Sequence, residues 1–522
     1  MASRRDELNA YTFAKRRTVA AFLQPSASGS EEGAPRPLRA VVPGLVTGAL
    51  LLTGFGAWGM FSPQAPRDWA VPGAKVIVGK QSTTRYVVLT TTEGGREHTR
   101  LHPVLNLASA RLLLDPRRSQ VVQVADEVLD AGTPPRGAVV GIPYAPDRLP
   151  AEADAGRPKR WAVCQRPGGN GPGGTGPAAQ GAVQSAVLVL ADREARLTDD
   201  ARRTTDTQVL YVRSTGGAQD RYLVDSAGRR YRFPGGGPHA ETLTRALVGE
   251  GATPQPVTEE WLATLDEGAD LAFPQLPGTP GAVARVPGLA GPDDKVGTVL
   301  TAQTGTGTQY YVVLPGRVAT VSEFVAVLLL ASPATDVLDL HGKAREVDLQ
   351  SLRPDTAPFM RGVAWPSRRG VQVNRVADTP GAPPGGERRD TICSVLRSVD
   401  AQGGRRLSTW AGTGFPVDVT AGGTSSYVTP GTGLLYTQVQ GRRGAAGGGA
   451  LFLVTDTGLR YAVQADGGSG SDPERRRNGA GEAQIRLGYG GVVPAPVPIA
   501  WSEFLSKGPR LDTDSARQPQ GS

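Results

Sequence analysis

The residues that could carry out chemistry in this chain are few. Its two cysteines, Cys164 and Cys393, can join in a disulfide in an oxidising compartment or remain two buried free thiols. A metal site is the weaker alternative, because no histidine lies near either of them in the sequence. If they bridge, a closed loop of about 230 residues would remove roughly 5 kcal/mol of conformational entropy from the unfolded chain. We interpret such a bridge as a structural clamp.

The other candidate motifs fall short of a catalytic or binding site. The segment GAKVIVGKQS (residues 73–82) resembles a phosphate-binding loop, but its glycines are spaced too widely, and Gln81 follows Lys80 where that motif needs Ser or Thr. His98 and His102 would share one face of a strand and could hold zinc, although surface histidines are the simpler interpretation. No G-x-S-x-G or H-E-x-x-H motif occurs. We therefore predict no catalytic residue, cofactor or metal.

One uncharged apolar run, VVPGLVTGALLLTGFGAWGMF, occupies residues 41–61. As a helix, its roughly 21 residues would span ~30 Å, the thickness of the hydrocarbon core of a bilayer. A cleaved signal peptide is the alternative, but its apolar core is usually only about 7–15 residues long and ends in small residues, whereas Trp58, Met60 and Phe61 end this run. We predict an uncleaved transmembrane helix.

Charge predicts the orientation of that helix. Basic residues outnumber acidic ones in residues 1–40, and basic flanks of a membrane span face the cytoplasm. We therefore expect a single-pass protein of the inner (cytoplasmic) membrane, with a cytoplasmic N-terminus and an extracytoplasmic C-terminal bulk.

The stretch SRRDELNAYTFAKRRTVAAFL predicts a basic amphipathic helix, with Ser3 and Asp6 at the spacing of a capping box. Such a helix can lie on anionic lipid or dock on a partner protein. We favour docking on a partner protein, because a single isolated helix has no tertiary structure of its own to pack into. The candidate docking residues are Arg4, Arg5, Leu8, Tyr11, Phe13, Lys15, Arg16, Arg17 and Phe22.

Composition points to short strands and many turns in the rest of the chain. Glycine (69) and proline (43) are abundant, yet apolar runs recur throughout. The net charge of +8 comes largely from arginine and partly from the N-terminal stretch, so we attribute it to coding bias and expect no nucleic-acid binding. Segments at 166–182, 377–390 and 467–481 are so rich in glycine and proline that we predict flexible loops there.

Internal similarity indicates a duplication. YLVDSAGRRY (222–231) and FLVTDTGLRY (452–461) share Leu, Val, Gly, Arg and Tyr at the same offsets, and each predicts a hairpin. A Pro-x-Pro-Val and a tryptophan follow each of them, Trp261 in one half and Trp501 in the other. Earlier in each half, a second pair of segments shares YVVL and LLL. We infer four small repeats, each a hairpin followed by a short helix. Each repeat must pack against its neighbours to bury enough apolar surface.

The predicted fold is α+β and β-rich: a single N-terminal transmembrane helix, then the four repeats around a central, mostly β domain that the cysteines would pin. The predicted parts are residues 1–40 (cytoplasmic helical tail), 41–61 (transmembrane helix), 70–117 (repeat 1), 118–210 (central domain, first part), 211–275 (repeat 2), 295–334 (repeat 3), 335–440 (central domain, second part), 448–510 (repeat 4) and 511–522 (disordered tail).

The opening stretch, the lone apolar run, the duplicated exterior with one cysteine in each half, and the two hairpin sequences together resemble the EccB family, a membrane component of the type VII (ESX) secretion systems of actinobacteria. The resemblance covers nearly the whole chain. It implies a disulfide between Cys164 and Cys393, and partnership with EccC, EccD and EccE in the membrane complex. It also implies a lipid bilayer as surroundings and self-association of the exterior.

The function that this resemblance implies is a structural subunit that scaffolds export of small folded helical proteins across the inner membrane. Two alternatives remain open. The first is an extracytoplasmic ATPase or hydrolase subunit of the same system, because the family is sometimes described as an ATPase. The second is a cell-wall-binding module.

Overall fold

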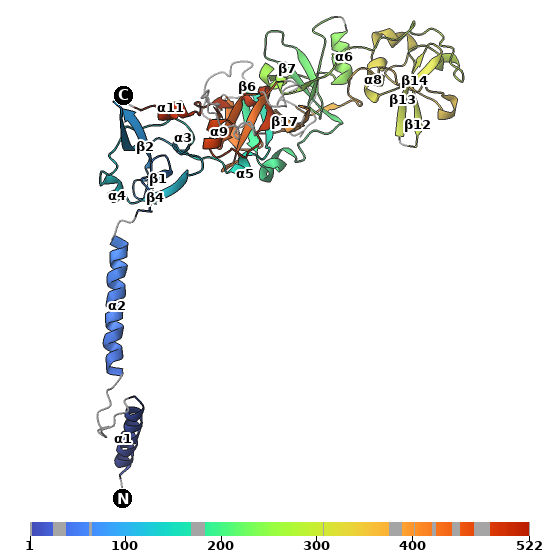
Figure 1. Ribbon diagram of the computed structural model, residues 1–522. Helices are drawn as coiled ribbons and strands as arrows, with labels where there is room; N and C mark the ends of the chain where they lie inside the picture. Colours follow the sequence, from blue (N-terminus) through green and yellow to red (C-terminus); the bar gives the residue numbers. More distant parts are fainter. Residues whose placement is uncertain are drawn as a thin grey trace, which may run out of the picture. The chain divides into compact units, whose positions relative to one another are not determined.

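The computed structural model describes residues 3–23, 38–61, 65–168, 183–237, 239–305, 307–374, 389–400, 402–419, 424–440, 449–463 and 481–520. Their secondary structure is mixed and rich in strands (Figure 1), which confirms the α+β, β-rich prediction. The chain divides into two compact units, each described by itself. The first is Met1–Trp69 with Val78–Thr83 and Val122–Thr133, and the second is Ala70–Ile77, Thr84–Val121 and Pro134–Ser522.

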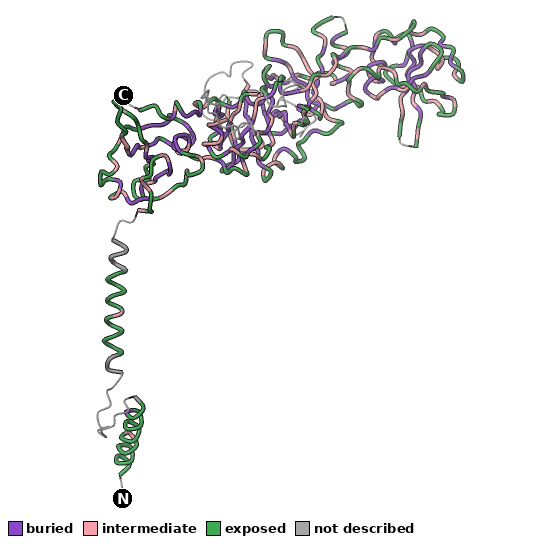
Figure 2. Tube along the Cα trace, viewed as in Figure 1, coloured by how far each residue is buried: buried purple, intermediate pink, exposed green. Residues whose placement is uncertain are grey.

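The first unit contains the helices α1 (Arg4–Leu23), α2 (Leu38–Phe61) and α4 (Asp126–Asp130). The capping-box spacing predicted at the start of α1 is realised, since the Ser3 N–H donates to the Asp6 carboxylate (3.1 Å) and the Arg5 N–H donates to the Ser3 hydroxyl (3.3 Å). Both long helices are largely exposed (Figure 2).

The predicted membrane span at residues 41–61 lies within α2. Among the residues described, no helix combines the length and the apolar character that a membrane crossing requires. The transmembrane assignment therefore stays a prediction.

Two four-stranded sheets have the same strand order, β3-β2-β1-β4 and β14-β13-β12-β15. In each, an antiparallel hairpin (β2–β3 or β13–β14) is followed by a helix whose first turn is capped by a side chain, Asn106 for α3 and Ser322 for α8. The elements are β1 (Lys75–Gly79), β2 (Arg85–Glu93), β3 (Arg96–Val104), α3 (Leu107–Leu113), β4 (Gln120–Val124), β12 (Val299–Thr304), β13 (Gly307–Leu314), β14 (Arg317–Val321), α8 (Glu323–Leu330) and β15 (Arg345–Glu346).

Two five-strand paths also share one order, β10-β7-β8-β9-β11 and β23-β20-β21-β22-β24. In both, the outer strands pair in parallel and the inner strands antiparallel. The elements are β7 (Gln208–Ser214), β8 (Arg221–Val224), β9 (Arg229–Arg232), α6 (Ala240–Leu247), β10 (Gln255–Val257), α7 (Glu259–Ala263), β11 (Asp266–Glu267), β20 (Gly433–Val439), β21 (Leu451–Thr455), β22 (Leu459–Ala462), α9 (Glu482–Arg486), β23 (Ala495–Pro498), α10 (Ile499–Ser502) and β24 (Ser506–Lys507); β16 (Val371–Gln372) also pairs with β7.

The fifth sheet, called the central sheet below, has the order β18-β17-β5-β6-β19. Its strands come from distant parts of the chain: β5 (Arg160–Pro167), β6 (Val183–Leu190), β17 (Thr391–Val399), β18 (Arg405–Gly412) and β19 (Thr424–Val428). Smaller elements connect the sheets, namely α5 (Glu152–Ala155), η2 (Asp192–Thr198), η3 (Gly291–Asp293), η4 (Pro333–Leu338) and η5 (Leu349–Ser351).

Alternate residues of β5 enter two different cores, as the period of two in a strand requires. Trp161 and Val163 join the largest apolar cluster, which also contains Trp261 and Trp501. Ala162 and Cys164 join a smaller cluster on the other face of the central sheet. The central sheet is therefore buried on both faces.

Two apolar clusters join neighbouring small sheets. One cluster combines residues from 76–155 with residues from 435–516, and another combines Leu243 and Leu247 of α6 with Phe324 and Leu328 of α8. The sheet β14-β13-β12-β15 differs, because its strands line two clusters of their own, drawn from residues 276–365, and only α8 reaches the core of a neighbouring sheet.

Two hairpin glycines set how closely the β8–β9 and β21–β22 hairpins approach the central sheet. Gly228 and Gly458 have φ angles of +76° and +78°, which glycine adopts without strain. A Cβ at Gly228 would lie 2.7 Å from the Leu407 side chain of β18, and one at Gly458 would lie 2.2 Å from the Ser426 hydroxyl of β19. The two hairpin turns therefore pack on the two opposite edge strands of the central sheet.

Two predicted boundaries and the predicted tail need correction. Residues 117 and 334 were expected to end repeats, but β4 and β15 follow them and complete their sheets, because such short strands leave little pattern in the sequence. The disordered tail predicted from residue 511 is wrong for 511–520. Helix α11 (Thr513–Arg517) forms there and packs on α3, capped by Asp512 (2.7 Å to the Ser515 N–H), with Leu511 and Ala516 buried. The predicted flexible loops lie mostly outside the described residues.

Candidate interaction and assembly sites

Cys164 of β5 and Cys393 of β17 face each other across antiparallel strands and form a disulfide, with Cα atoms 3.9 Å apart. Both are completely buried. Of the alternatives that the sequence leaves open, the structure therefore contains the bridge. It joins the two halves of the chain at the middle strands of the central sheet.

An aspartate adds a second link between the same two strands. Asp199, just after η2, accepts two hydrogen bonds from Arg397 of β17 (2.6 and 3.1 Å) and another from Arg160 of β5. The hydrogen bonds from Arg397, with those from Arg160, lower the pKa of Asp199 to about 2 even though burial opposes this shift. The carboxylate is thus ionised wherever the protein is folded near neutral pH.

The segment that resembles a phosphate loop forms an internal turn. The N–H groups of Gln81 and Ser82 both donate to the Asp126 carboxylate (2.7 and 2.9 Å), and so does the Ser82 hydroxyl (2.7 Å). A Cβ at Gly79 would lie only 2.2 Å from the same carboxylate. The backbone donors that would cradle a phosphate are therefore occupied by a carboxylate of the chain itself.

The two histidines of the candidate pair lie in different surroundings. His102 is buried, and its Nδ1 donates to the Ala138 carbonyl (2.8 Å), so the expectation of a surface histidine is wrong at this position. His98, in the same strand, is half-buried. Across the ranges that the structure describes, no group of three His, Cys, Asp or Glu side chains is placed to hold a metal ion.

Two arginines tie α3 to α9. Arg111 of α3 donates to the Leu487 carbonyl (2.9 Å), and Arg486 of α9 donates to the Leu114 carbonyl (2.7 Å). Both carbonyls lie at helix C-termini, where a cation is favourable. The arrangement is reciprocal, since each helix supplies one arginine and one carbonyl.

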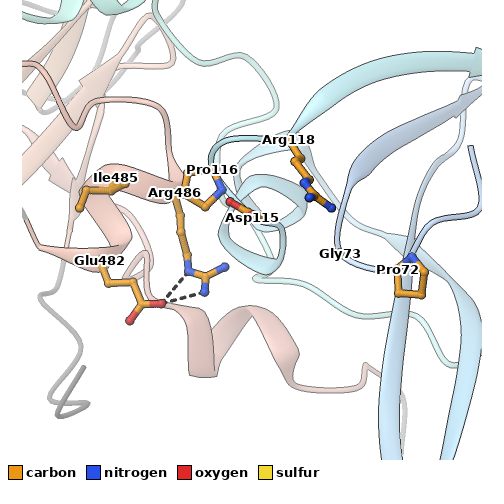
Figure 3. Close-up of a pocket in the computed structure, with 8 residues that line it drawn as sticks. All are labelled: Pro72, Gly73, Asp115, Pro116, Arg118, Glu482, Ile485 and Arg486. Atoms are coloured by element: carbon orange, nitrogen blue, oxygen red, sulfur yellow. Dashed lines mark hydrogen bonds and ion pairs between the residues drawn. The ribbon is translucent and has the colours of Figure 1, made fainter. Parts of the chain in front are cut away.

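A pocket of about 350 Å³ lies beside this contact (Figure 3). Arg118 and Arg486 extend into it, and Arg486 also binds Glu482 (2.9 and 2.7 Å). Asp115 supplies a second acidic side chain to the lining. Because its acidic and basic side chains balance, the pocket suits a polar contact between α3 and α9 better than a site for a strongly charged ligand.

Sequence reasoning missed a buried lysine. The Lys159 ammonium is fully enclosed and donates to the Asp154 carboxylate (2.9 Å) and to the carbonyls of Asp154 (3.0 Å) and Arg157 (3.2 Å). The other Asp154 carboxylate oxygen accepts from the Gly433 N–H (3.0 Å) at the start of β20. No local signal distinguishes Lys159 from a surface lysine, because its burial depends on this distant segment.

The candidate docking residues all lie on α1 and are exposed: Arg4, Arg5, Leu8, Tyr11, Phe13, Lys15, Arg16, Arg17 and Phe22. Leu8, Tyr11 and Phe22 are 66%, 71% and 90% exposed. At about 100° per residue these three share one side of the helix, whereas Phe13 points to another. Their docking role stays a prediction.

Comparison with known proteins identifies the class. Residues 1–521 match the family model described as "Type VII secretion system ESX-1, transport TM domain B". A relative named "ESX-3 secretion system ATPase EccB3" from Mycolicibacterium smegmatis is 27% identical over 92% of this chain and 84% of its own. Another, "ESX-5 secretion system ATPase EccB5" from Mycobacterium marinum, is 26% identical over 98% of this chain and 93% of its own.

Solved structures agree on the fold. A chain of an intact ESX-5 inner membrane complex matches with a TM-score of 0.58 and 22% identity, over 100% of this chain and 96% of that one. A chain of the EccB3 dimer from the ESX-3 core complex matches with a TM-score of 0.55 over 85% and 99%. The protein thus belongs to the class of type VII secretion system components. Within that class the chain belongs to the EccB family, which confirms the resemblance in its sequence.

Removing the disulfide should destabilise the fold. The double variant Cys164→Ala with Cys393→Ala is expected to lose about 2–5 kcal/mol of unfolding free energy, because the long loop is no longer closed in the unfolded state. Urea denaturation of the purified full-length protein measures this. Reductant should lower the midpoint of the wild-type protein and leave the double variant unaffected; equal midpoints for the two oxidised proteins would contradict the clamp.

The Asp199 cluster should make stability depend on acid pH. Because its folded pKa is about 2 against an ordinary 3.8, the ionised carboxylate stabilises the fold above pH 3.8, and this contribution is lost as the pH falls towards 2. Asp199→Asn should cost about 1–2 kcal/mol at neutral pH and flatten that dependence. Thermal unfolding between pH 2 and pH 7 tests both effects, with exposed Asp206→Asn as the control expected to stay near wild type; an unchanged slope for Asp199→Asn would refute the assignment.

Proposed function

We propose that this protein is a structural subunit of the inner-membrane complex of a type VII (ESX) secretion system, where it scaffolds export of small folded helical proteins. The observation that carries the proposal is the family match over residues 1–521. Relatives that cover nearly the same length are named as components of ESX-3 and ESX-5 systems. A similarly folded chain is part of an intact ESX-5 inner membrane complex.

The role is structural rather than catalytic, although the names of the relatives include the word ATPase. The turn most similar to a phosphate loop holds the Asp126 carboxylate with its own backbone N–H groups. A nucleotide phosphate would have to displace the Asp126 carboxylate from these N–H groups. The phosphate would then lie close to a second negative charge, which is unfavourable. The extensive use of buried links such as Cys164–Cys393 suits a rigid scaffold.

We infer that α2 crosses the inner membrane, with α1 in the cytoplasm and the rest outside. Three observations support this topology: the uncharged run in α2, the exposure of its large side chains (Leu45 69%, Leu52 77%, Phe55 75%), and the disulfide, which persists in oxidising compartments. The surplus of basic residues before the span favours a cytoplasmic N-terminus.

We infer that the exterior is built from four repeats around the central sheet. Two pairs of small sheets share their strand orders, which supports the duplication. Trp261 and Trp501 also stand at the same distance in sequence from the first residues of equivalent parallel strands, Gln255 of β10 and Ala495 of β23. The central sheet between the repeats takes its strands from both halves.

The proposed partners are EccC, EccD and EccE, together with a second copy of this chain. Support for the second copy comes from the similar fold of a chain in the EccB3 dimer. Helix α1 is the proposed docking element for the other subunits, and the exposed side that carries Leu8, Tyr11 and Phe22 is its contact surface.

The docking role of α1 predicts a face-specific loss of partners. Tyr11→Ser with Phe22→Ser should reduce recovery of EccC, EccD and EccE at least tenfold, since two aromatic anchors worth roughly 1–2 kcal/mol each are removed. Affinity purification of the tagged full-length protein, followed by mass spectrometry, measures the recovery. Phe13→Ser, on another side of the helix, should retain the partners. Full recovery with the double variant would remove α1 from the interface.

The topology predicts a link between insertion and disulfide formation. Leu51→Arg should cost about 2.5–3.5 kcal/mol of insertion free energy and leave uninserted protein in the reducing cytoplasm. Membrane fractionation with non-reducing electrophoresis should therefore show a fall in both membrane yield and Cys164–Cys393 oxidation, while Leu51→Phe matches wild type. Normal yield and oxidation for Leu51→Arg would mean that α2 does not cross the bilayer.

A further inference from the structure

A groove lies between α7 and α10, two short helices that pack against each other beside the central sheet. Its volume is about 570 Å³, in the range of sites that bind small molecules or single side chains of a partner. Trp261 and Trp501, one from each helix, are completely buried. The Trp261 indole N–H also donates to the Val163 carbonyl of β5 (2.9 Å), so α7 is held firmly and the groove is preformed.

The polar atoms at the base of the groove are already bonded within the protein. Gln165 of β5 donates through its amide to the hydroxyls of Thr258 and Ser185 (both 2.9 Å), and its amide oxygen accepts from the Thr258 N–H (3.0 Å). The remaining lining is apolar, with Phe504 half-buried and Ile499, at the exposed edge, 36% exposed. An occupant therefore gains mainly by burying apolar surface there.

The rim of the groove is acidic on both sides. When Trp261 and Trp501 are superposed in sequence, Glu260 on α7 corresponds to an alanine on α10, and Glu503, directly after α10, corresponds to an alanine on α7. Both glutamates are exposed, and within the described part of the chain neither side chain has a hydrogen bond or ion pair. The net charge of the chain is +8, so these two carboxylates make the groove locally negative on a protein that is positive overall.

We propose that this groove docks a polypeptide segment of another protein in which an apolar side chain is flanked by lysine or arginine. The apolar base takes the central side chain, and Glu260 and Glu503 pair with the cations on either side. Charge complementarity selects this occupant, because acidic flanks would be repelled from both rims. The inference does not rest on the proposed secretion role, since binding is a property of the isolated protein.

The test uses three labelled peptides and the full-length protein. Lys-Lys-Leu-Phe-Lys-Lys should bind saturably in fluorescence anisotropy, whereas Lys-Lys-Ser-Ser-Lys-Lys and Glu-Glu-Leu-Phe-Glu-Glu should bind at least tenfold more weakly. Glu260→Gln with Glu503→Gln should weaken the first peptide about tenfold, because two exposed ion pairs are lost. Glu241→Gln with Glu250→Gln, which removes two exposed acids elsewhere, is the matched control and should not change binding.

Ile499→Asp supplies an independent variant, because it places a charge on the exposed edge of the groove without altering the buried tryptophans. It should also weaken the first peptide. Equal affinity for all three peptides, equal effects of the groove and control variants, or no saturable binding would overturn the proposal. So would a change confined to self-association in sedimentation of Ile499→Asp, which would assign the groove to a second copy of this chain.

Discussion

The pairing of β5 with β17 is the contact on which the rest of the fold depends. These strands come from opposite halves of the chain, and their side chains form the disulfide and supply both arginines that bind Asp199. Backbone pairing, a covalent bond and an ion-pair cluster thus fix the same register. A slip of one residue would send Cys393 to the opposite face and break all three.

The small sheets depend on this centre and on one another. The hairpin turns at Gly228 and Gly458 pack on its two edge strands, and the tryptophans of α7 and α10 enter its main core. Edge strands of an open sheet invite unwanted pairing, and here a hairpin turn packs on each of them. The outlying sheets are then stabilised in pairs, by the Arg111 and Arg486 contacts at one end and by apolar packing of α6 on α8 at the other.

Sequence reasoning succeeded where the signal is local. The two hairpin sequences and the Ser3–Asp6 cap depend on residues within a few positions of each other, and all are present. It failed where a distant partner decides the outcome. The tail at 511–520 is polar, yet it is ordered because Leu511 and Ala516 reach the core that α3 shares.

The candidate sites divide in the same way. The cysteines were recognisable by type, but the sequence left open whether they pair, because only the strand register brings them together. Lys159 and Asp199 gave no signal at all, since their roles come from Gly433 and Arg397 more than 190 positions away. The groove between α7 and α10 likewise gave no signal in the sequence. It forms between helices from opposite halves of the chain, and no single motif marks it.

The strand order of the central sheet also dictates when it can assemble. Cys393 leaves the ribosome 229 residues after Cys164, a delay of about 10–50 s at usual synthesis rates. Until then β5 and β6 form only a lone two-stranded ribbon with apolar residues on both faces. The nascent protein must therefore be shielded from aggregation while these 229 of its 522 residues are made, and strands from its last quarter, beginning at Thr391, complete the part of the fold that began earlier.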